Sequence, residues 1–355
     1  MRLSVPAIAC CLLLGLSGAA ASRQSGATAA PQLAERVDVA RVVVDVHVLA
    51  PDGTPIRGLQ RSDFRAFVDG REVGIERVRW TAESVGERTP ASRTDAPSEV
   101  SRAVSELPAG RQIVLFAQRD LEPSRFQGLV TMLRRATSFL DGLGPDDRVA
   151  VVSMHSHLDL WTDYTADRRV LRDLVERRLV VEPPPADVAV NRGLSLFRFL
   201  DRAAGRRADN IEQALLVLAR GLDQLPGRKS IVLFGFGAGR WSGGAGGSQL
   251  TFDPAYDEAR RLLTRARAAV YCLDITDAAA HSLDAGLMAV AEDTGGFFVR
   301  TGVWPGLAMN RLALALEGRY ELSFVRPDLP AGDHAIRIEL VSRKGTVLAR
   351  RSYRS

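Results

Sequence analysis

Cysteine, aromatic residues and runs of like charge are all scarce in this chain of 355 residues, and each scarcity excludes a class of protein. Three cysteines are too few for a disulfide-dense scaffold. Aromatic residues make up 6% of the sequence, which leaves few rings on which nucleic-acid bases could stack. No run of five basic residues occurs and the net charge is +5, so we expect no nucleic-acid partner.

The N-terminus has the features of a secretory signal peptide. Arg2 provides a positive charge, residues 5–16 are apolar apart from one proline, and residues 19–21 form a small-residue cleavage site. The apolar run is too short for a comfortable membrane span, although an uncleaved anchor is the alternative. We therefore predict removal of residues 1–21, no membrane span afterwards, and a secreted or periplasmic protein. Its one remaining cysteine, Cys272, lies in an apolar strand pattern and is expected to be buried.

The remaining composition, 46% hydrophobic and 25% charged, is that of a folded protein of about two domains. Residues 22–36 are small and polar and predict a flexible leader. Valines at every second position from Val42 to Val48, followed by turn signals, predict a small β unit over residues 37–81. Residues 82–110 have little apolar content and predict a linker.

From Arg111 onwards, strand and helix patterns alternate. Short apolar runs typical of strands buried on both faces recur at residues 113–116, 149–154, 230–234, 269–273 and 297–299. This alternation predicts an α/β domain with a doubly wound, mostly parallel sheet over residues 111–302, with a short edge strand at 159–162. An irregular insertion is expected at 182–208 and a last helix at 303–317.

After Gly318 the apolar pattern returns to a period of two, and residues 347–353 are predicted to form the final strand. Neither β part is large enough to bury a core by itself. We therefore expect residues 318–355 to pack with residues 37–81, which makes one small all-β domain into which the α/β domain is inserted.

Local signals predict two helix starts and one loop. Ser124 with Gln127, and Asn210 with Gln213, have the spacing of capping boxes. The glycine-rich residues 235–247 are predicted to form a loop.

Four motifs in the α/β region resemble the von Willebrand factor A (vWA) family. They are the strand at 112–116, GPDDRVAVV at 144–152, GRKSIVLF at 227–234 and AEDTGG at 291–296. The flanking patterns are Gly58-Leu59, Asp63-Phe64, Asp69-Gly70 and the strand that contains Tyr320. They look like those of the bacterial vWA-related family best known from acidobacteria. The resemblance covers residues 37–353. It implies an exported protein-binding module, often with a divalent cation at the carboxyl end of the sheet.

In that family the cation is held by Asp-x-Ser-x-Ser after the first strand, a Thr from a second loop and an Asp from a third. Such oxygen ligands suit Mg²⁺, which demands an octahedral oxygen shell. Asp209 or Asn210 matches the second-loop position, but glycine-rich residues 235–239 follow the third strand. The first-loop positions fall on Ala117, Arg119 and Leu121. We therefore predict a degenerate site that binds no metal, and no cofactor.

Two alternatives remain open at this rim. Asp120, Glu122 and Ser124 reproduce the acidic-x-polar-x-Ser spacing and are the candidates for a shifted, weak cation site, although the third-loop acid is still missing. The guanidinium of Arg119 or Arg240 is a candidate to replace the cation and to pair with a partner's carboxylate. The simpler interpretation of both arginines is a solvated loop residue.

Other candidate chemistry is weak. His155 and His157 alternate along a strand end, so they cannot easily share a metal. No G-x-S-x-G elbow is present, and Cys272 does not begin a helix. We therefore expect a protein that is not an enzyme. The alternative is an envelope-associated hydrolase with its site in the 182–208 insertion.

The favoured hypothesis is that another protein docks where loops 117–125, 155–165, 205–210 and 235–252 converge, at the carboxyl ends of the parallel strands. Trp241 is the candidate anchor of that contact. The complete set of candidate ligand-binding residues is Arg119, Asp120, Asn210, Arg240 and Trp241.

Overall fold

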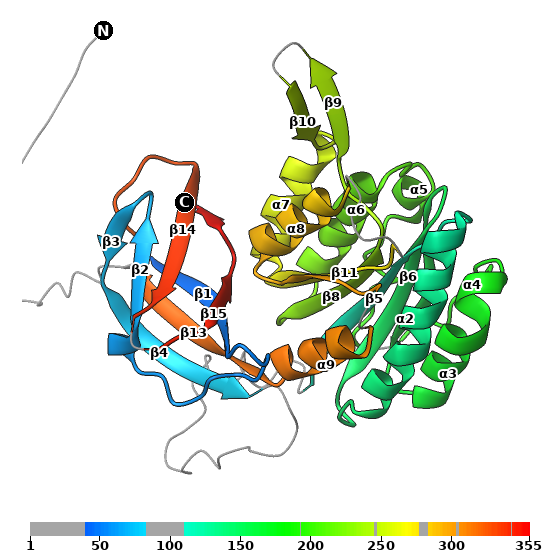
Figure 1. Cartoon of the computed structure of the whole chain (residues 1–355), viewed down its shortest axis with the longest axis horizontal. Helices are drawn as coiled ribbons and strands as arrows, with labels where there is room; N and C mark the ends of the chain where they lie inside the picture. The colour runs from blue at the N-terminus through cyan, green and yellow to red at the C-terminus, as the bar shows by residue number, and fades with distance from the viewer. Residues whose placement is uncertain are drawn as a thin grey trace, which may run out of the picture. The chain divides into compact units, whose positions relative to one another are not determined.

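The computed structural model describes residues 40–82, 110–191, 193–244, 247–276, 283–302, 305–341 and 343–355. The predicted signal peptide and leader, and nearly all of the predicted linker, lie outside these residues. Within the described residues, no helix combines the length and apolarity that a membrane span requires. The described residues fold into one six-stranded, mostly parallel sheet flanked by helices, two antiparallel sheets of four strands each, and a two-stranded hairpin (Figure 1).

The mostly parallel sheet has six strands in the order β12-β11-β8-β5-β6-β7, which confirms the predicted α/β sheet. Four of its strands are buried along nearly their whole length, as the short apolar runs predicted. The predicted edge strand is longer than expected and is the antiparallel member of the sheet. The strands are β5 (Gln112–Gln118), β6 (Arg148–Met154), β7 (Leu158–Thr165), β8 (Lys229–Gly235), β11 (Ala268–Asp274) and β12 (Phe298–Arg300).

Helices cover both faces of this sheet because alternate strand residues point to opposite sides. One apolar core packs α6, α7 and α8 against side chains such as Val114, and Cys272 is buried in it as predicted. The other core packs α2, α3 and α9 against side chains such as Leu115. The helical elements are α2 (Pro123–Asp141), α3 (Arg168–Asp173), the π-helical η2 (Leu174–Arg178), α4 (Leu179–Val181), α5 (Arg202–Gly205), α6 (Ile211–Asp223), α7 (Ala255–Arg265), α8 (Asp284–Thr294) and α9 (Pro305–Ala315).

The two antiparallel sheets have four strands each and share one apolar core. The first has the order β15-β1-β13-β4, so β1 from the N-terminal part of the chain pairs with β13 and β15 from the C-terminal part. The second has the order β16-β14-β2-β3. Their elements are β1 (Arg41–Leu49), the 3-10 turn η1 (Arg61–Asp63), β2 (Phe64–Val68), β3 (Arg71–Val73), β4 (Ile75–Ala82), β13 (Gly318–Val325), β14 (Asp333–Leu340), β15 (Thr346–Ala349) and β16 (Ser352–Arg354).

Three local predictions were wrong. The final strand predicted at 347–353 is split at Arg350, because β15 pairs with β1 whereas β16 pairs with β14 of the other sheet. The predicted loop at 235–247 contains a strand, β9 (Arg240–Gly244), which pairs with β10 (Gly247–Thr251) in a hairpin that projects beyond the helices in Figure 1. Helix α2 begins after Glu122 rather than Ser124, since Pro123 is pre-organised for the first helical position.

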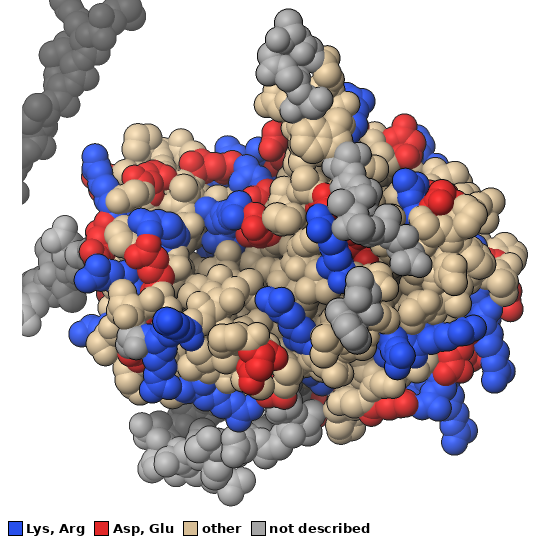
Figure 2. Space-filling view, viewed as in Figure 1, with Lys and Arg blue, Asp and Glu red and all other residues tan. Residues whose placement is uncertain are grey.

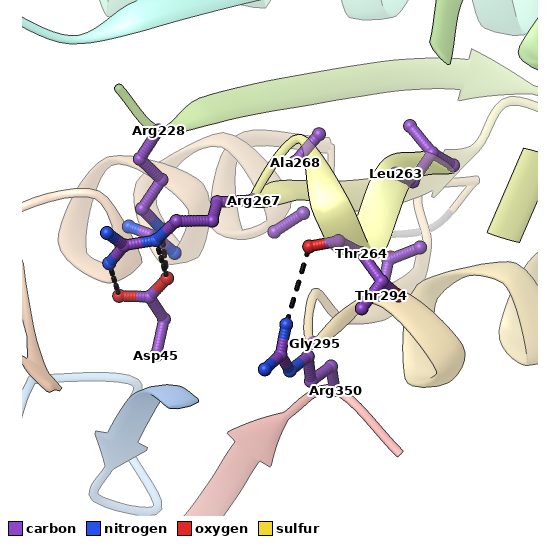
Figure 3. A pocket seen from close by; sticks show the side chains of 10 residues that line it. Asp45, Arg228, Leu263, Thr264, Arg267, Ala268, Thr294, Gly295 and Arg350 are labelled. Atoms are coloured by element: carbon purple, nitrogen blue, oxygen red, sulfur yellow. Dashed lines mark hydrogen bonds and ion pairs between the residues drawn. The ribbon is translucent and has the colours of Figure 1, made fainter. Parts of the chain in front are cut away.

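A largely buried carboxylate, that of Asp45 with its side chain 16% exposed, connects β1 with the α/β part of the chain. Asp45 accepts hydrogen bonds from Arg267 Nε (3.0 Å) and Nη2 (2.7 Å), and from Arg319 Nε at 2.6 Å. Arg228 Nε lies 3.7 Å from the same carboxylate. Figure 3 shows Asp45 facing Arg228 and Arg267. Burial would raise the pKa of Asp45, but the nearby arginines outweigh burial and hold the pKa far below its ordinary value.

Candidate functional site

The carboxyl ends of the parallel strands form a rim. Here the first loop, residues 119–122 after β5, meets the third loop, residues 236–239 after β8. Adjacent strands β5 and β8 end at Gln118 and Gly235. The buried side chain of Gln118 accepts hydrogen bonds through Oε1 from the backbone N–H groups of Phe236 (2.9 Å) and Gly237 (3.3 Å). A neutral amide therefore ties these two loops together. Sequence reasoning missed Gln118 because it took positions 117, 119 and 121 as the ligand positions; the available signal was an amide at the end of a buried strand.

The candidate shifted cation site is internally hydrogen-bonded. The Asp120 carboxylate accepts from the Arg125 guanidinium and from the backbone N–H of Glu122 at 3.1 Å. The Glu122 carboxylate accepts from the Ser124 hydroxyl and from the backbone N–H of Arg125 at 3.1 Å, and the Ser124 hydroxyl is the main cause of its lowered pKa. The described residues contain no group of three or more His, Cys, Asp or Glu side chains able to hold a metal ion.

Arg125 places a positive charge between the first and third loops. Its guanidinium lies 4.3 Å from the ring centroid of Phe236 in the third loop, while it also bonds Asp120 in the first. The predicted candidate Arg119 points elsewhere. It donates to the carbonyl oxygens of Val180 (3.2 Å) and Glu182 (3.3 Å) at the end of α4, and burial lowers its pKa.

The second loop, residues 206–210 before α6, meets the third loop around the start of α6. Asn210 caps this helix as predicted, since its Oδ1 accepts from the backbone N–H of Gln213 at 2.9 Å. Its Nδ2 donates to Asp253 Oδ2 (3.1 Å), just before α7. Buried Glu212, which sequence reasoning missed, accepts from the backbone N–H of Gly239 at 2.6 Å, and burial raises its pKa. Its position in the first turn of α6, beside a predicted rim loop, was the available signal.

The candidates Arg240 and Trp241 begin the hairpin strand β9. The carbonyl of Arg240 accepts from the Thr251 hydroxyl at 3.2 Å, and Trp241 lies opposite Leu250 on β10. Arg240 and Asn210 both lie near Asp253. The backbone N–H of Ala255 is the main cause of the lowered pKa of Asp253, and Asn210 and Arg240 lower it further. Arg119 and Asp120 lie elsewhere on the rim, near α4.

Large apolar side chains are exposed at this rim. Leu121 in the first loop is 78% exposed, Val181 at the end of α4 is 74% exposed, and Trp241 on the hairpin is 42% exposed. The bonds from Arg119 to Val180 and Glu182 place Leu121 and Val181 on neighbouring segments. Leu121 and Val181 therefore form one exposed apolar pair, and Trp241 is a separate exposed ring on the hairpin.

The 182–208 insertion is anchored by a carboxylate that sequence reasoning missed. Buried Asp163 on β7 accepts through Oδ1 from the backbone N–H groups of Leu196 (2.7 Å) and Phe197 (3.2 Å). Its Oδ2 accepts from the backbone N–H of Asn191 at 3.2 Å. An acid directly after the predicted edge strand was the available signal. These bonds give Asp163 a structural task in holding the insertion against the sheet.

Charged side chains are mixed on the face of the molecule shown in Figure 2. Lys and Arg are interspersed with Asp and Glu across it and form no continuous basic stripe. A stripe of that kind is the usual electrostatic mark of a nucleic-acid surface.

Comparison with known proteins yields distant structural likenesses. No protein-family model and no curated protein matches this chain. Among solved structures, the chain is similar to BatB from Bacteroides thetaiotaomicron, with 14% identity, 58% of this chain and 97% of that chain covered, and a TM-score of 0.37. An aerotolerance-related membrane protein from Bacteroides fragilis has 13% identity, with 59% of this chain and 98% of that chain covered, and a TM-score of 0.35.

Proximal thread matrix protein 1 from the mussel byssus has 10% identity, with 58% of this chain and 48% of that chain covered, and a TM-score of 0.38. The chain thus spans about half the length of the mussel protein. At these identities and TM-scores the likenesses carry no inference about activity or partners. The vWA resemblance, including its acidobacterial grouping, accordingly stays a prediction from the sequence motifs.

Proposed function

We propose that this chain is an exported, non-enzymatic protein-binding module of the vWA type. Its α/β domain, residues 111–302, is inserted into a β domain built from the N- and C-terminal strands. Another protein docks on the rim at the carboxyl ends of the parallel strands, and no metal ion takes part. The observation that carries the proposal is the exposure of Leu121, Val181 and Trp241 on this one rim.

Protein recognition is the function that suits these side chains. An exposed tryptophan on a hairpin that extends from the body provides a large, rigid contact area, and such residues dominate binding energies. Leu121 and Val181 add apolar surface beside the guanidinium of Arg119, which is held in place by two carbonyl groups. Arg119 therefore offers a pre-positioned charge at the edge of an apolar contact.

The metal-free part of the proposal rests on two groups at the loop junction. Gln118 brings a neutral amide there, and Arg125 brings a positive charge that stacks on Phe236. Arg125 would repel a divalent cation placed between these loops. The carboxylate of Asp120, which could serve as a ligand, is already hydrogen-bonded to Arg125.

We expect the melting temperature of the mature protein to be the same in Mg²⁺, in Mn²⁺ and in a chelator. An ion that binds only the native state at one hundred times its Kd would stabilise the fold by about 2.7 kcal/mol, which thermal unfolding detects readily. A melting temperature that rises with the concentration of either ion, and falls again with chelator, would contradict the metal-free site.

We expect Trp241→Ala to weaken binding to the partner by about tenfold or more, because loss of a buried aromatic anchor typically costs at least ~2 kcal/mol. Partners captured from the source cell's envelope by the mature chain would be identified, and the Kd of each would be measured with purified proteins. Val341→Ala is the matched control, since Val341 is 48% exposed at the end of β14, away from the rim. Equal affinity of wild type and Trp241→Ala for every partner, with Leu121→Ser also unchanged, would refute rim docking.

A further inference from the structure

The first antiparallel sheet has an incomplete edge along β1. On one side β1 pairs with β13 from Arg41 to Val46. On the other side its partner β15 covers residues 46–49, and no strand among the described residues pairs with residues 41–45. The first half of β1 is therefore an open sheet edge.

The hydrogen-bonding groups of this open edge point away from β13. The carbonyl of Ala40 accepts from the backbone N–H of Arg326, on the β13 side, at 2.9 Å. Bonding directions alternate along an antiparallel strand, so Arg41, Val43 and Asp45 direct their N–H and C=O groups to the other side. Val43 shows this, because its carbonyl accepts from Arg350 Nη2 at 2.8 Å.

A groove of about 650 Å³ runs along the open edge. The start of β1 forms one wall, α7 contributes Arg261 and Leu262, and β16 contributes Tyr353 and Arg354. Val43 is 38% exposed beside it. An extended backbone could therefore reach the edge without passing through the core.

The groove is strongly basic. Its charged lining comprises six arginines and two acids, namely Arg41, Arg261, Arg265, Arg326, Arg350, Arg354, Glu258 and Asp333. Both acids are paired, Glu258 with Arg220 at 2.9 Å and Asp333 with Arg260 at 3.5 Å and with Arg261 at 4.0 Å. Two of the lining arginines are paired outside the groove, Arg41 with Glu76 and Arg265 with Asp223.

Two of these arginines, Arg326 and Arg354, have no acidic partner among the described residues, and Arg350 has only the more distant charge of Asp45. No carboxylate of the described residues lies within ion-pairing distance of the guanidinium groups of Arg326, Arg350 and Arg354. Arg350 donates only to the carbonyls of Val43 and Thr264, and its Nε has no hydrogen-bond partner in the described part of the chain. Figure 3 shows Arg350 reaching towards Thr264. An anionic ligand would supply the missing charge.

We propose that this groove binds an extended acidic peptide segment of a partner protein, which adds a strand to the open edge of β1. A peptide N–H replaces Arg350 at the carbonyl of Val43, and the guanidinium of Arg350 turns to a peptide carboxylate. Backbone pairing supplies affinity, and the unpaired arginines supply the preference for acidic side chains. The groove residues differ from the rim residues, so a failed test of peptide binding in the groove would not contradict docking on the rim.

The test uses the full mature chain and a fluorescein-labelled eight-residue peptide of alternating Glu and Val, with fluorescence anisotropy as the readout. We expect saturable binding that weakens as salt rises. The double variant Arg326→Glu/Arg354→Glu is expected to weaken it about tenfold or more, since repulsion replaces attraction at two sites. Arg134→Glu, an exposed position on α2, is the control for charge reversal and is expected to leave the Kd unchanged.

Strand addition is tested separately from charge. Val43→Pro removes one N–H from the open edge, where proline is tolerated, and it is expected to weaken binding. A Glu-Val peptide methylated at alternate backbone nitrogens tests the same pairing on the wild-type chain, so the result does not depend on how the variant folds.

Three results of the peptide-binding measurements would overturn the proposal. They are equal affinity for a Lys-Val peptide, equal affinity for the methylated peptide, and no binding of the Glu-Val peptide. A dimer in solution that Val43→Pro converts to monomer would also overturn it, because a second copy would then occupy the edge.

Discussion

Asp45→Asn is expected to lower the free energy of unfolding by roughly 3–5 kcal/mol, the usual cost of removing one partner from a buried ion pair. The replacement keeps the shape of the side chain and removes only its charge. Arg319 and Arg228 have side chains only 10% and 9% exposed, so water cannot replace the lost carboxylate at their guanidinium groups. Their mutual repulsion with Arg267 would then act without its main counter-charge.

The charge of Asp45 among these arginines also predicts a fold that acid destabilises. The pKa of Asp45 is held below its ordinary value, so its contribution to stability is fully present above the ordinary carboxyl pKa of about 3.9. That contribution is lost as the pH falls below about 4 towards the lowered value. Urea unfolding at a series of pH values should show a shallower loss of stability below pH 4 for Asp45→Asn than for wild type.

Glu321→Gln is the matched control for this experiment. Glu321 also accepts from Arg267, at 3.2 Å, but its side chain is 23% exposed and it bonds only the more exposed arginines. We expect a loss of about 1 kcal/mol or less. Equal effects of the two substitutions would show that the position of Asp45 among the arginines has no special weight.

Gly128→Ala is expected to destabilise the protein by about 3 kcal/mol or to prevent folding, although alanine favours a helix by ~1 kcal/mol over glycine. A Cβ at Gly128 would lie 1.6 Å from the carbonyl oxygen of Ile275. The atoms of Ile275 that it would meet belong to the backbone and cannot rotate aside, so α2 would have to move away from the end of β11. Chemical unfolding measures the loss, and the near-UV circular dichroism reports whether the remaining fold is intact.

Gly306→Ala provides the comparison. Gly306 lies in the first turn of α9, and a Cβ there meets no atom within 4 Å. We expect it to leave stability unchanged or to raise it slightly. If Gly128→Ala were as stable as Gly306→Ala, the close approach of α2 to β11 would not exist in solution.

Periodicity in the sequence was sufficient to predict β5, β6, β8 and β11, because each is a continuous apolar run that is buried on both faces. It failed at β9 and β10, whose glycine-rich residues show no apolar alternation. Their pairing depends on meeting each other across a turn. The split of the final strand was equally invisible, since Val347 and Tyr353 fit one period-two pattern although their partners lie in different sheets.

The candidate site was predicted less completely than the fold. Local sequence identified the cap at Asn210, because a cap depends on neighbouring residues. The loops predicted at 155–165 and 235–252 are largely the strand β7 and the hairpin of β9 and β10. The bonds of Gln118 to residues 236 and 237, and of Arg125 across to Phe236, join segments that lie far apart in the sequence. A single sequence holds no local signal for such contacts, so their consequences for the cation site emerged only from the structure.

The pairing of β1 and β4 with β13 bears on how this chain folds as it leaves the ribosome. Both strands are synthesised early, yet their shared neighbour, in which Leu322 lies opposite Val44 and Val78, is made only after the entire parallel sheet. Closing so large a loop is slow, and the valine-rich side of β1 stays uncovered until then. We therefore expect nascent chains to expose this apolar strand face until β13 has been made, and the strands around β13 to be the last to become protected from hydrogen exchange.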